Sequence, residues 1–290
     1  TFAVDTASDI TLSNVANDFT GAVSVTSARD ATLVDANAID LGTSTITRNL
    51  VVTATAGAGA ITQTGGALAV TGTSTFATDV ASDITLGDAT NNFVDSVFIT
   101  SGNNVTLVDA GAIDLGTSAV SGTYAVTATA GGGITQTGGA ITVTGGPSTF
   151  TAATGQTIIL GNTSNAFTGA VTFAGPTLGG VTVANTGAFD LGALTLGAGA
   201  NLVVTATGAV TQSGVLTVPG TTSISAAGQL VTLTLANDFT GAVSVDGLTV
   251  QLTDTNSIVL GGSTVTDTYT VIASAGDITQ AASSPLVVTN

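Results

Sequence analysis

The stretch Ala16–Val25 reads ANDFTGAVSV, and the same ten residues return letter for letter at Ala236–Val245. Two weaker copies lie between them, NNFVDSVFI from Asn91 and NAFTGAVTF from Asn165. The phenylalanines that mark the four copies recur about every 74 residues, at Phe19, Phe93, Phe167 and Phe239. A period this long and this faithful predicts a repeat architecture for the whole chain.

The composition favours β-structure. The chain of 290 residues contains no Glu, Lys, Met, Trp, Cys or His, so the residues that usually build exposed helix faces are missing. Threonine, valine and isoleucine are abundant, and these β-branched residues suit strands. Short alternating runs such as ITL at Ile10–Leu12 and ATLV at Ala31–Val34 are separated by Gly, Asn, Asp and Ser, which is typical of short strands and turns. We therefore expect an all-β chain.

A finer period appears when one large apolar residue is taken from each short run. Sixteen such residues follow one another at an average step of about 18.4 residues. They are Phe2, Phe19, Ile39, Ile61, Phe76, Phe93, Ile113, Ile134, Phe150, Phe167, Phe189, Val210, Ile224, Phe239, Ile258 and Ile278. This step is too short for a propeller blade and suits one turn of a parallel β-helix, or β-solenoid, in which stacking buries a continuous core. We predict about 15–16 turns of roughly 18–19 residues, with four turns in each repeat of about 74 residues.

The repeat boundaries predict one continuous β-solenoid over residues 1–290. Its units are a partial unit 1–9, then 10–83, 84–157 and 158–230, and a partial unit 231–290. Thr1–Asp9 matches Thr75–Asp83, so we expect the sequence to be a window of a longer array.

Aromatic residues define the predicted core register. Pairs that lie one predicted turn apart are expected to stack inside the core on successive turns, with ring centroids about 4.5–7 Å apart. The register residues are Phe2, Phe19, Phe76, Phe93, Phe150 and Phe167, with Ile224 replacing the aromatic residue opposite Phe239.

The charge balance excludes several partners. Eighteen Asp residues stand against two cations, Arg29 and Arg48, which gives a net charge of −16. Such a chain is unsuited to nucleic acid or to an anionic membrane surface. No run of consecutive apolar residues is long enough to cross a bilayer, so we expect no membrane-spanning helix. Without Cys, the chain is not a disulfide scaffold.

Several motifs together resemble a known family. ANDFTGAVSV is followed by TLVDANAIDLGTS (Thr32–Ser44) and AITQTGG (Ala60–Gly66), and TLVDAGAIDLGTS recurs at Thr106–Ser118. These strings resemble the repeats of large bacterial filamentous haemagglutinin-like exoproteins. The resemblance implies a right-handed parallel β-helix, export through an outer-membrane partner (two-partner secretion), and display or release as an adhesive fibre.

Catalysis has few of its usual residues. Without His, Cys, Lys or Glu, the common nucleophile–base pairs are missing. Two carboxylates can hydrolyse a glycosidic bond when they lie roughly 5–9.5 Å apart. The candidate pairs are Asp35 with Asp40 and Asp109 with Asp114, but the third repeat keeps only Asp190 and the fourth only Asp254. A unique active site would not be written twice and then fade, so we predict no catalytic residues and no enzyme activity.

Metal and ligand signals are also weak. Calcium needs six to eight oxygen ligands, and no EF-hand or glycine-rich calcium nonapeptide is present. We predict no cofactor; the loose groups Asp9/Asp18, Asp35/Asp40 and Asp79/Asp83/Asp88 leave open a weak surface Ca²⁺ site, against a role in capping turns. The glutamine of the recurrent ITQ motif, in its four copies Gln63, Gln136, Gln212 and Gln280, could contact a carbohydrate or bond a neighbouring turn.

The sequence predicts a structural function. We expect an extracellular or cell-surface stalk segment of a bacterial adhesin, whose receptor, a host or matrix glycan or protein, binds outside this window. One alternative is a filament or sheath whose copies associate laterally or end to end. An alternative of another class is a β-helical polysaccharide-active enzyme, which would need a cleft lined by clustered Asp, Arg or aromatic residues.

Overall fold

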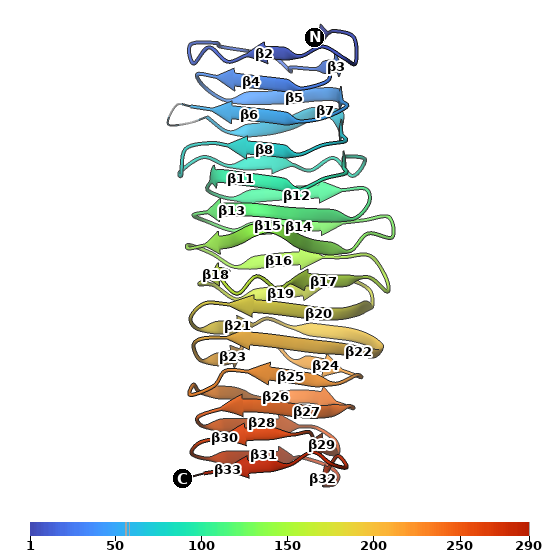
Figure 1. Cartoon of the computed structure of the whole chain (residues 1–290), viewed down its shortest axis with the longest axis vertical. Helices are drawn as coiled ribbons and strands as arrows, with labels where there is room; N and C mark the ends of the chain where they lie inside the picture. The colour runs from blue at the N-terminus through green and yellow to red at the C-terminus, as the bar shows by residue number, and fades with distance from the viewer. Residues whose placement is uncertain (56, 58, 290) are drawn as a thin grey trace. The chain divides into compact units, whose positions relative to one another are not determined.

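The computed structural model describes residues 1–55, 57 and 59–289, and it contains strands and turns but no helix within that part of the chain. The described strands pair in parallel, each with the corresponding strand of the next turn, so the chain is a parallel β-solenoid (Figure 1). Two compact units are distinguished, Thr1–Thr151 and Ala152–Asn290. Each unit is described by itself.

In the first unit, alternate strands along the chain build two walls, which we call the first and second wall. The first wall contains β2 (Ile10–Leu12), β4 (Ala31–Asp35), β6 (Leu50–Ala54), β8 (Ser74–Ala77), β11 (Val97–Gly102), β13 (Ile113–Val120) and β15 (Ile134–Val143). The second wall contains β5 (Ile39–Ile46), β7 (Ile61–Val70), β9 (Ile84–Leu86), β10 (Asn92–Phe93), β12 (Val105–Asp109), β14 (Tyr124–Ala128) and β16 (Ser148–Thr151). Two short strands, β1 (Phe2–Ala3) and β3 (Val25–Ser27), pair with each other beside them.

The second unit repeats this plan. Its first wall contains β17 (Thr157–Leu160), β20 (Leu178–Asn185), β22 (Leu194–Ala206), β25 (Thr222–Ser225), β27 (Ala242–Gly247), β29 (Ile258–Leu260), β30 (Ser263–Val265), β32 (Ile278–Gln280) and β33 (Leu286–Val288). Its second wall contains β19 (Val171–Ala174), β21 (Phe189–Leu191), β23 (Val210–Gln212), β26 (Val231–Phe239), β28 (Val250–Asp254) and β31 (Tyr269–Ala273). The short strands β18 (Ala166–Phe167) and β24 (Leu216–Val218) complete the unit.

The strand register corrects the predicted turn length. In the first wall of the first unit, Ala31 pairs with Leu50, Leu50 with Ser74, and Ser74 with Val97. These turns therefore take roughly 19 to 24 residues each, more than predicted. The solenoid has about 14 turns instead of the predicted 15–16. The shorter predicted step was wrong because the sixteen apolar residues used to derive it come from both walls and from different columns.

Each repeat of the sequence spans three and a half turns rather than four. Three turns separate Ala31 from Val97, and Val105, the counterpart of Ala31 in the next repeat, stands half a turn further on in the second wall beside Ile84. The second unit behaves in the same way: Ile158 belongs to the first wall and its counterpart Val231 to the second. Every sequence motif therefore alternates between the two walls from one repeat to the next.

The core follows from the alternation of the strands. In β4 and β12 the residues at odd positions are buried and those between them are partly exposed. The column Ile39, Ile61 and Ile84 is fully buried, and it lies in register on three successive turns. One turn cannot cover its own apolar face, so the stack supplies the burial that stabilises each turn.

The aromatic register is partly confirmed and partly wrong. Phe76, Phe93, Phe150, Phe167, Ile224 and Phe239 are buried, whereas Phe2 and Phe19 are half-buried. The rings of Phe2 and Phe19 lie 6.2 Å apart and those of Phe76 and Phe93 6.1 Å apart, within the expected range. However, Phe76 lies on the first wall and Phe93 on the second, so the two rings meet edge to face across the core of one turn instead of stacking on successive turns.

Three buried hydroxyl groups recur at the same position of the repeat. Ser74, Ser148 and Thr222 are each at most 1% exposed, and within the described residues their hydroxyl oxygens have no hydrogen-bond partner. Ser44 is also buried, but its hydroxyl accepts from the Val25 N–H at 3.0 Å and donates to the Gly42 carbonyl at 2.9 Å.

Replacing the unpartnered hydroxyls should not destabilise the solenoid. An isolated buried hydroxyl costs free energy, so we expect Ser74→Ala and Thr222→Val to leave the free energy of unfolding unchanged or to raise it by up to about 1 kcal/mol. Ser44→Ala, the matched control, should lower it by about 1–2 kcal/mol. Urea unfolding of the three variants checks this, and a loss as large for Ser74→Ala as for Ser44→Ala would contradict it.

Candidate functional site

The most elaborate polar cluster lies at one corner of the solenoid, and we call it the Gln–Asn–Asp corner. In the first unit it consists of Gln63, Asn91 and Asp109, one from each of three successive turns. In the second unit the corresponding residues are Gln212, Asn237 and Asp254. The glutamine closes the ITQ motif, the asparagine stands two residues before the phenylalanine that marks each repeat, and the aspartate ends a strand.

The asparagine is the centre of the corner. The Asn91 Oδ1 atom accepts hydrogen bonds from Gln63 Nε2 at 2.6 Å and from the Leu68 N–H at 2.8 Å. Its Nδ2 atom donates to Gln63 Oε1 at 3.0 Å and to the carbonyls of Leu86 and Val108 at 3.4 and 3.2 Å. Asn91 is fully buried, so this one amide satisfies polar groups of three turns that water does not reach.

The aspartate ties the next turn to the corner. Asp109 is fully buried, and its Oδ2 accepts from the Phe93 N–H at 2.7 Å while its Oδ1 accepts from the Gly111 N–H at 2.6 Å. Two other copies repeat this pattern with the same atoms, Asp35 with Phe19 and Asn37, and Asp254 with Phe239 and Asn256. The motif ANDF therefore carries a backbone N–H that is capped by an aspartate of the following turn.

The third repeat shows that a neutral side chain can replace the carboxylate. Asn185 occupies the aspartate position, and its Oδ1 accepts from the Phe167 N–H at 2.7 Å. Its Nδ2 donates to the Ala188 carbonyl at 2.8 Å, where the aspartates accept from the N–H two residues on. The corner loop differs accordingly, because Gly187 adopts a left-handed φ of 86°.

Burial should make Asp109 titrate late. Desolvation raises the pKa of its carboxyl above the usual value near 3.8, although the Phe93 and Gly111 N–H groups oppose the shift. An acid whose folded pKa is raised binds its proton more tightly in the folded state. Its contribution to stability is therefore largest below pH 3.8 and declines as the pH rises through the folded pKa. A ¹³C NMR titration of the Asp109 carboxyl checks this, and a midpoint at or below 3.8 would contradict it.

The two predicted carboxylate pairs do not form shared sites. Asp35 and Asp109 point inward and are fully buried, whereas Asp40 and Asp114 lie on outward positions of β5 and β13. The Asp114 carboxylate accepts from the hydroxyls of Thr135 and Thr137 at 2.8 and 2.6 Å. The two members of each pair thus lie on opposite faces of the backbone.

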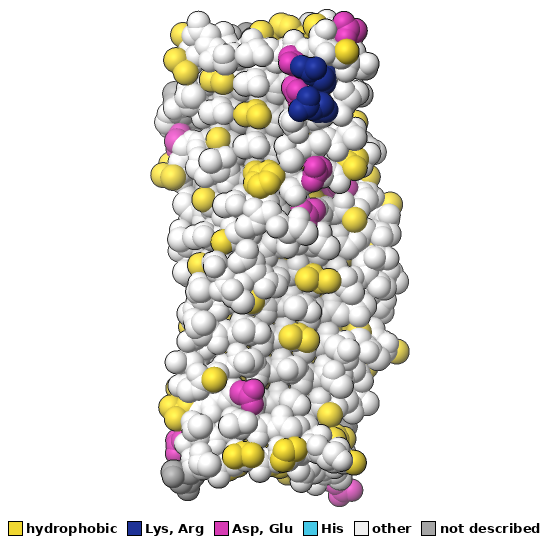
Figure 2. Space-filling model, viewed as in Figure 1, with side chains coloured by type: hydrophobic (Ala, Val, Ile, Leu, Met, Phe, Trp, Pro, Cys, Tyr) yellow, Lys and Arg dark blue, Asp and Glu magenta, His cyan; other side chains and the backbone are white. Residues whose placement is uncertain are grey.

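The two cations are already paired. The Arg29 guanidinium donates to both carboxylate oxygens of Asp9, at 2.8 and 2.7 Å, and Arg48 lies 3.6 Å from Asp30. Arg29 thereby holds the pKa of Asp9 below its usual value. Figure 2 shows the two arginines directly beside acidic side chains, on a face that is otherwise largely polar and uncharged. Since these pairs are exposed, they contribute little to stability.

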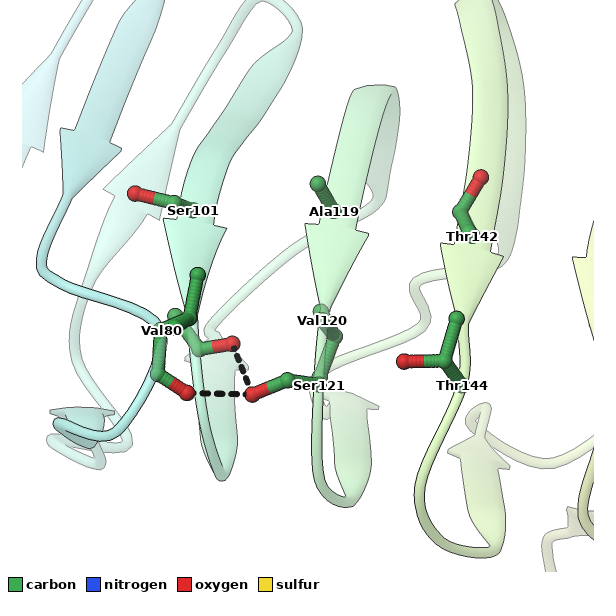
Figure 3. Close-up of a pocket in the computed structure, with 8 residues that line it drawn as sticks. Val80, Ser101, Ala119, Val120, Ser121, Thr142 and Thr144 are labelled. Atoms are coloured by element: carbon green, nitrogen blue, oxygen red, sulfur yellow. Dashed lines mark hydrogen bonds between the residues drawn. The ribbon is translucent and has the colours of Figure 1, made fainter.

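A shallow groove lies beside the loop that carries Val80. Ser101, Ala119 and Thr142, from three neighbouring strands, form its floor, and Val80 projects at its edge (Figure 3). The Ser121 hydroxyl donates to the carbonyls of Val80 and Gly102 at 2.5 and 3.3 Å. Its one strongly placed polar group therefore holds the loop in place.

Metal ligands do not gather in the described residues: no group of three or more Asp, Glu, His or Cys side chains is positioned to hold an ion there. Several exposed aspartates cap turns, as the alternative to calcium binding predicted. Asp79 accepts from the Ala81 N–H at 2.8 Å, and Asp88 from the Thr90 N–H at 2.8 Å. Across the part of the chain that the structure describes, no helix is long and apolar enough to cross a membrane.

Parallel turns with a recurrent buried corner define the protein as a β-solenoid repeat protein. The chain belongs to the family described as Repeats of unknown function (DUF5649), whose model matches residues 1–26, 28–100, 102–174, 178–246 and 247–290. Its two complete central matches, 28–100 and 102–174, agree in length with the period of the sequence. No curated protein and no solved structure matches the chain.

The corner contains residues that the sequence analysis passed over. The asparagine, present as Asn17, Asn91, Asn165 and Asn237, keeps its distance of two residues from the marker phenylalanine in all four copies. That invariance within one chain is the signal that identifies it. The Gln63 and Gln212 amides bond a neighbouring turn, the second of the two roles considered for the ITQ glutamine.

Proposed function

We propose that the protein is a structural, non-catalytic segment of an extended fibre that a bacterium secretes or displays on its surface. The observation that supports this best is the Gln–Asn–Asp corner. Its two complete copies use the most specific polar residues of the chain to fasten one turn to the next. Buried polar networks of this kind favour one register over its alternatives.

The fibre function follows from the geometry of stacking. Strands of successive turns lie about 4.8 Å apart, so a repeat of three and a half turns adds about 17 Å of length. Each repeat needs only its neighbours for stability, so reach can be extended by adding repeats. An outer-membrane secretion partner and a receptor bound elsewhere in the parent protein are expected from the resemblance to filamentous haemagglutinin-like exoproteins.

A ruler experiment tests this function. A variant in which residues 84–157 are duplicated should give a particle about 17 Å longer than the natural chain and equally wide, as measured by small-angle scattering and negative-stain electron microscopy. A duplicated chain that grows in width, or that forms a separate globule, would overturn the proposal.

Self-association is the second candidate function, and one observation favours it. Because motifs alternate between the walls, equivalent surfaces face opposite directions, as with Thr32 on the first wall and Thr106 on the second. A subunit with equivalent opposite faces can bind a copy on each side and form open-ended sheets. Analytical ultracentrifugation over a hundredfold range of concentration tests this, since a monomer throughout would exclude lateral assembly by this chain.

Polysaccharide hydrolysis is the function that this proposal excludes. We expect no release of reducing ends from acidic or neutral polysaccharides by the natural chain. Turnover that Asp40→Asn and Asp114→Asn abolish together, while the fold is retained, would replace the structural function by an enzymatic one.

A further inference from the structure

A single aromatic side chain lies on the outer face of the first wall. Phe98, in β11, is half-buried although it stands at an outward position between the buried Val97 and Ile99. It is in register with Thr75 of the previous turn. Most outward residues around it are Thr, Ser or Ala, so the aromatic ring interrupts a polar, uncharged surface.

The ring is supported from below by two glycines of the next turns. A Cβ atom added at Gly116 would lie 2.4 Å from Phe98 Cδ1, and one added at Gly138 would lie 3.2 Å from Phe98 Cε1. Any larger residue at either position would displace the ring. Backbone therefore fills one side of the ring and fixes its place on the wall.

Threonine hydroxyls surround the other side. Thr75, Thr100 and Thr117 line a shallow depression of about 340 Å³ together with Phe98. No charged residue lines it, and the nearby carboxylate of Asp114 is engaged by Ser96, Thr135 and Thr137. The depression thus combines one apolar ring with hydroxyl groups that can both donate and accept.

Other repeats provide internal controls. The position of Phe98 is occupied by Ser24, Thr172 and Ser244 in the other three copies. In each case the side chain rests on a glycine of the next turn: a Cβ at Gly42, Gly192 or Gly261 would lie 2.2, 2.3 or 2.1 Å from the hydroxyl oxygen. The glycine is thus a general feature of the repeat, and only the aromatic ring is specific to the second copy.

We propose that Phe98 and the threonines around it form a binding site for the pyranose ring of a neutral glycan. The apolar C–H face of a pyranose would cover the phenylalanine, and its equatorial hydroxyls would bond the threonine rim. Apolar burial on one ring face with a few convergent polar groups is the usual composition of a small-molecule site. A neutral sugar is favoured over an anionic one because the chain carries a net charge of −16. The site does not depend on the fibre function.

A glycan titration of the full chain tests the site. Cello-, malto- and chito-hexaose are the probes, and binding is followed by NMR of ¹³C-labelled phenylalanine rings. We expect at least one probe to shift the Phe98 resonances saturably, and Phe98→Ser to weaken that binding at least tenfold. Serine is native at this position in two other repeats, so the variant should fold. Ser244→Phe in the Phe98→Ser background should restore binding, because it rebuilds the ring on Gly261.

Three outcomes would overturn the proposal. One is the absence of saturable binding by all three probes at millimolar concentration. The second is binding that Phe98→Ser leaves unchanged. The third is a change in sedimentation of the natural chain that Phe98→Ser abolishes without any effect of glycans, which would assign Phe98 to contact with a second copy.

Discussion

Replacing Asn91 by alanine should cost about 3–5 kcal/mol of the free energy of unfolding. The variant removes five hydrogen bonds and leaves the buried N–H of Leu68 and the carbonyls of Leu86 and Val108 without their partner. The Gln63 amide loses both of its bonds to Asn91 as well. Buried backbone groups without a partner are among the few causes of losses this large.

The control is the next residue along the chain. Asn92 is exposed, so Asn92→Ala should change stability by no more than about 0.5 kcal/mol. Hydrogen exchange measures the effect locally, because each turn of a repeat protein contacts only its neighbours. The Leu68 N–H should exchange much faster in Asn91→Ala and unchanged in Asn92→Ala. Equal protection of Leu68 in the two variants would show that the corner is not a stabilising element.

The second large effect is expected at Gly132, where two turns approach closely. A Cβ atom at this position would lie 1.8 Å from the carbonyl oxygen of Gly111, which belongs to backbone and cannot rotate away. Gly132→Ala should therefore force the turns apart and destabilise the first unit by about 3 kcal/mol.

Gly87 provides the matched control for this substitution. No atom lies within 4 Å of a Cβ at Gly87, and its φ is not in the left-handed region. Gly87→Ala should be neutral or stabilise by about 0.5 kcal/mol, because alanine restricts the unfolded chain. Thermal unfolding of the two variants measures the difference, and equal melting temperatures would contradict the close approach of the turns at Gly132.

The class of fold could be predicted because composition, alternation and a long repeat all pointed to stacked parallel strands. The number of turns could not, because the length of a repeat does not state how many turns it contains. Phe76 and Phe93 are close in sequence and touch, which agrees with a short turn until the register shows that they lie on opposite walls. Contact between two core residues does not distinguish half a turn from a whole one when the core is narrow.

The candidate sites illustrate the same limit. Asp35 and Asp40 are close in sequence, but a strand end and a corner separate them, so one is buried and the other faces outward. Asn91 drew no attention because asparagine is common in turns, and its hydrogen bonds come from residues up to 28 positions away. Phe98 was passed over because it stands where the other copies of the motif have serine or threonine, and one such exception carries no periodic signal.

The central claim is that each repeat spans three and a half turns and alternates between two walls, and distances between paired spin labels test it most directly. The chain has no cysteine, so labels can be attached at introduced cysteines alone. Thr62→Cys with Thr149→Cys places both labels on the second wall four turns apart, which predicts about 19 Å. Thr32→Cys with Thr106→Cys, although closer in sequence, places the labels on opposite walls and predicts about 30 Å, from about 17 Å along the stack, about 10 Å between the walls and the outward reach of the labels. A distance of about 19 Å for Thr32 and Thr106 would mean that a repeat closes on the same wall after four turns, and would contradict the account.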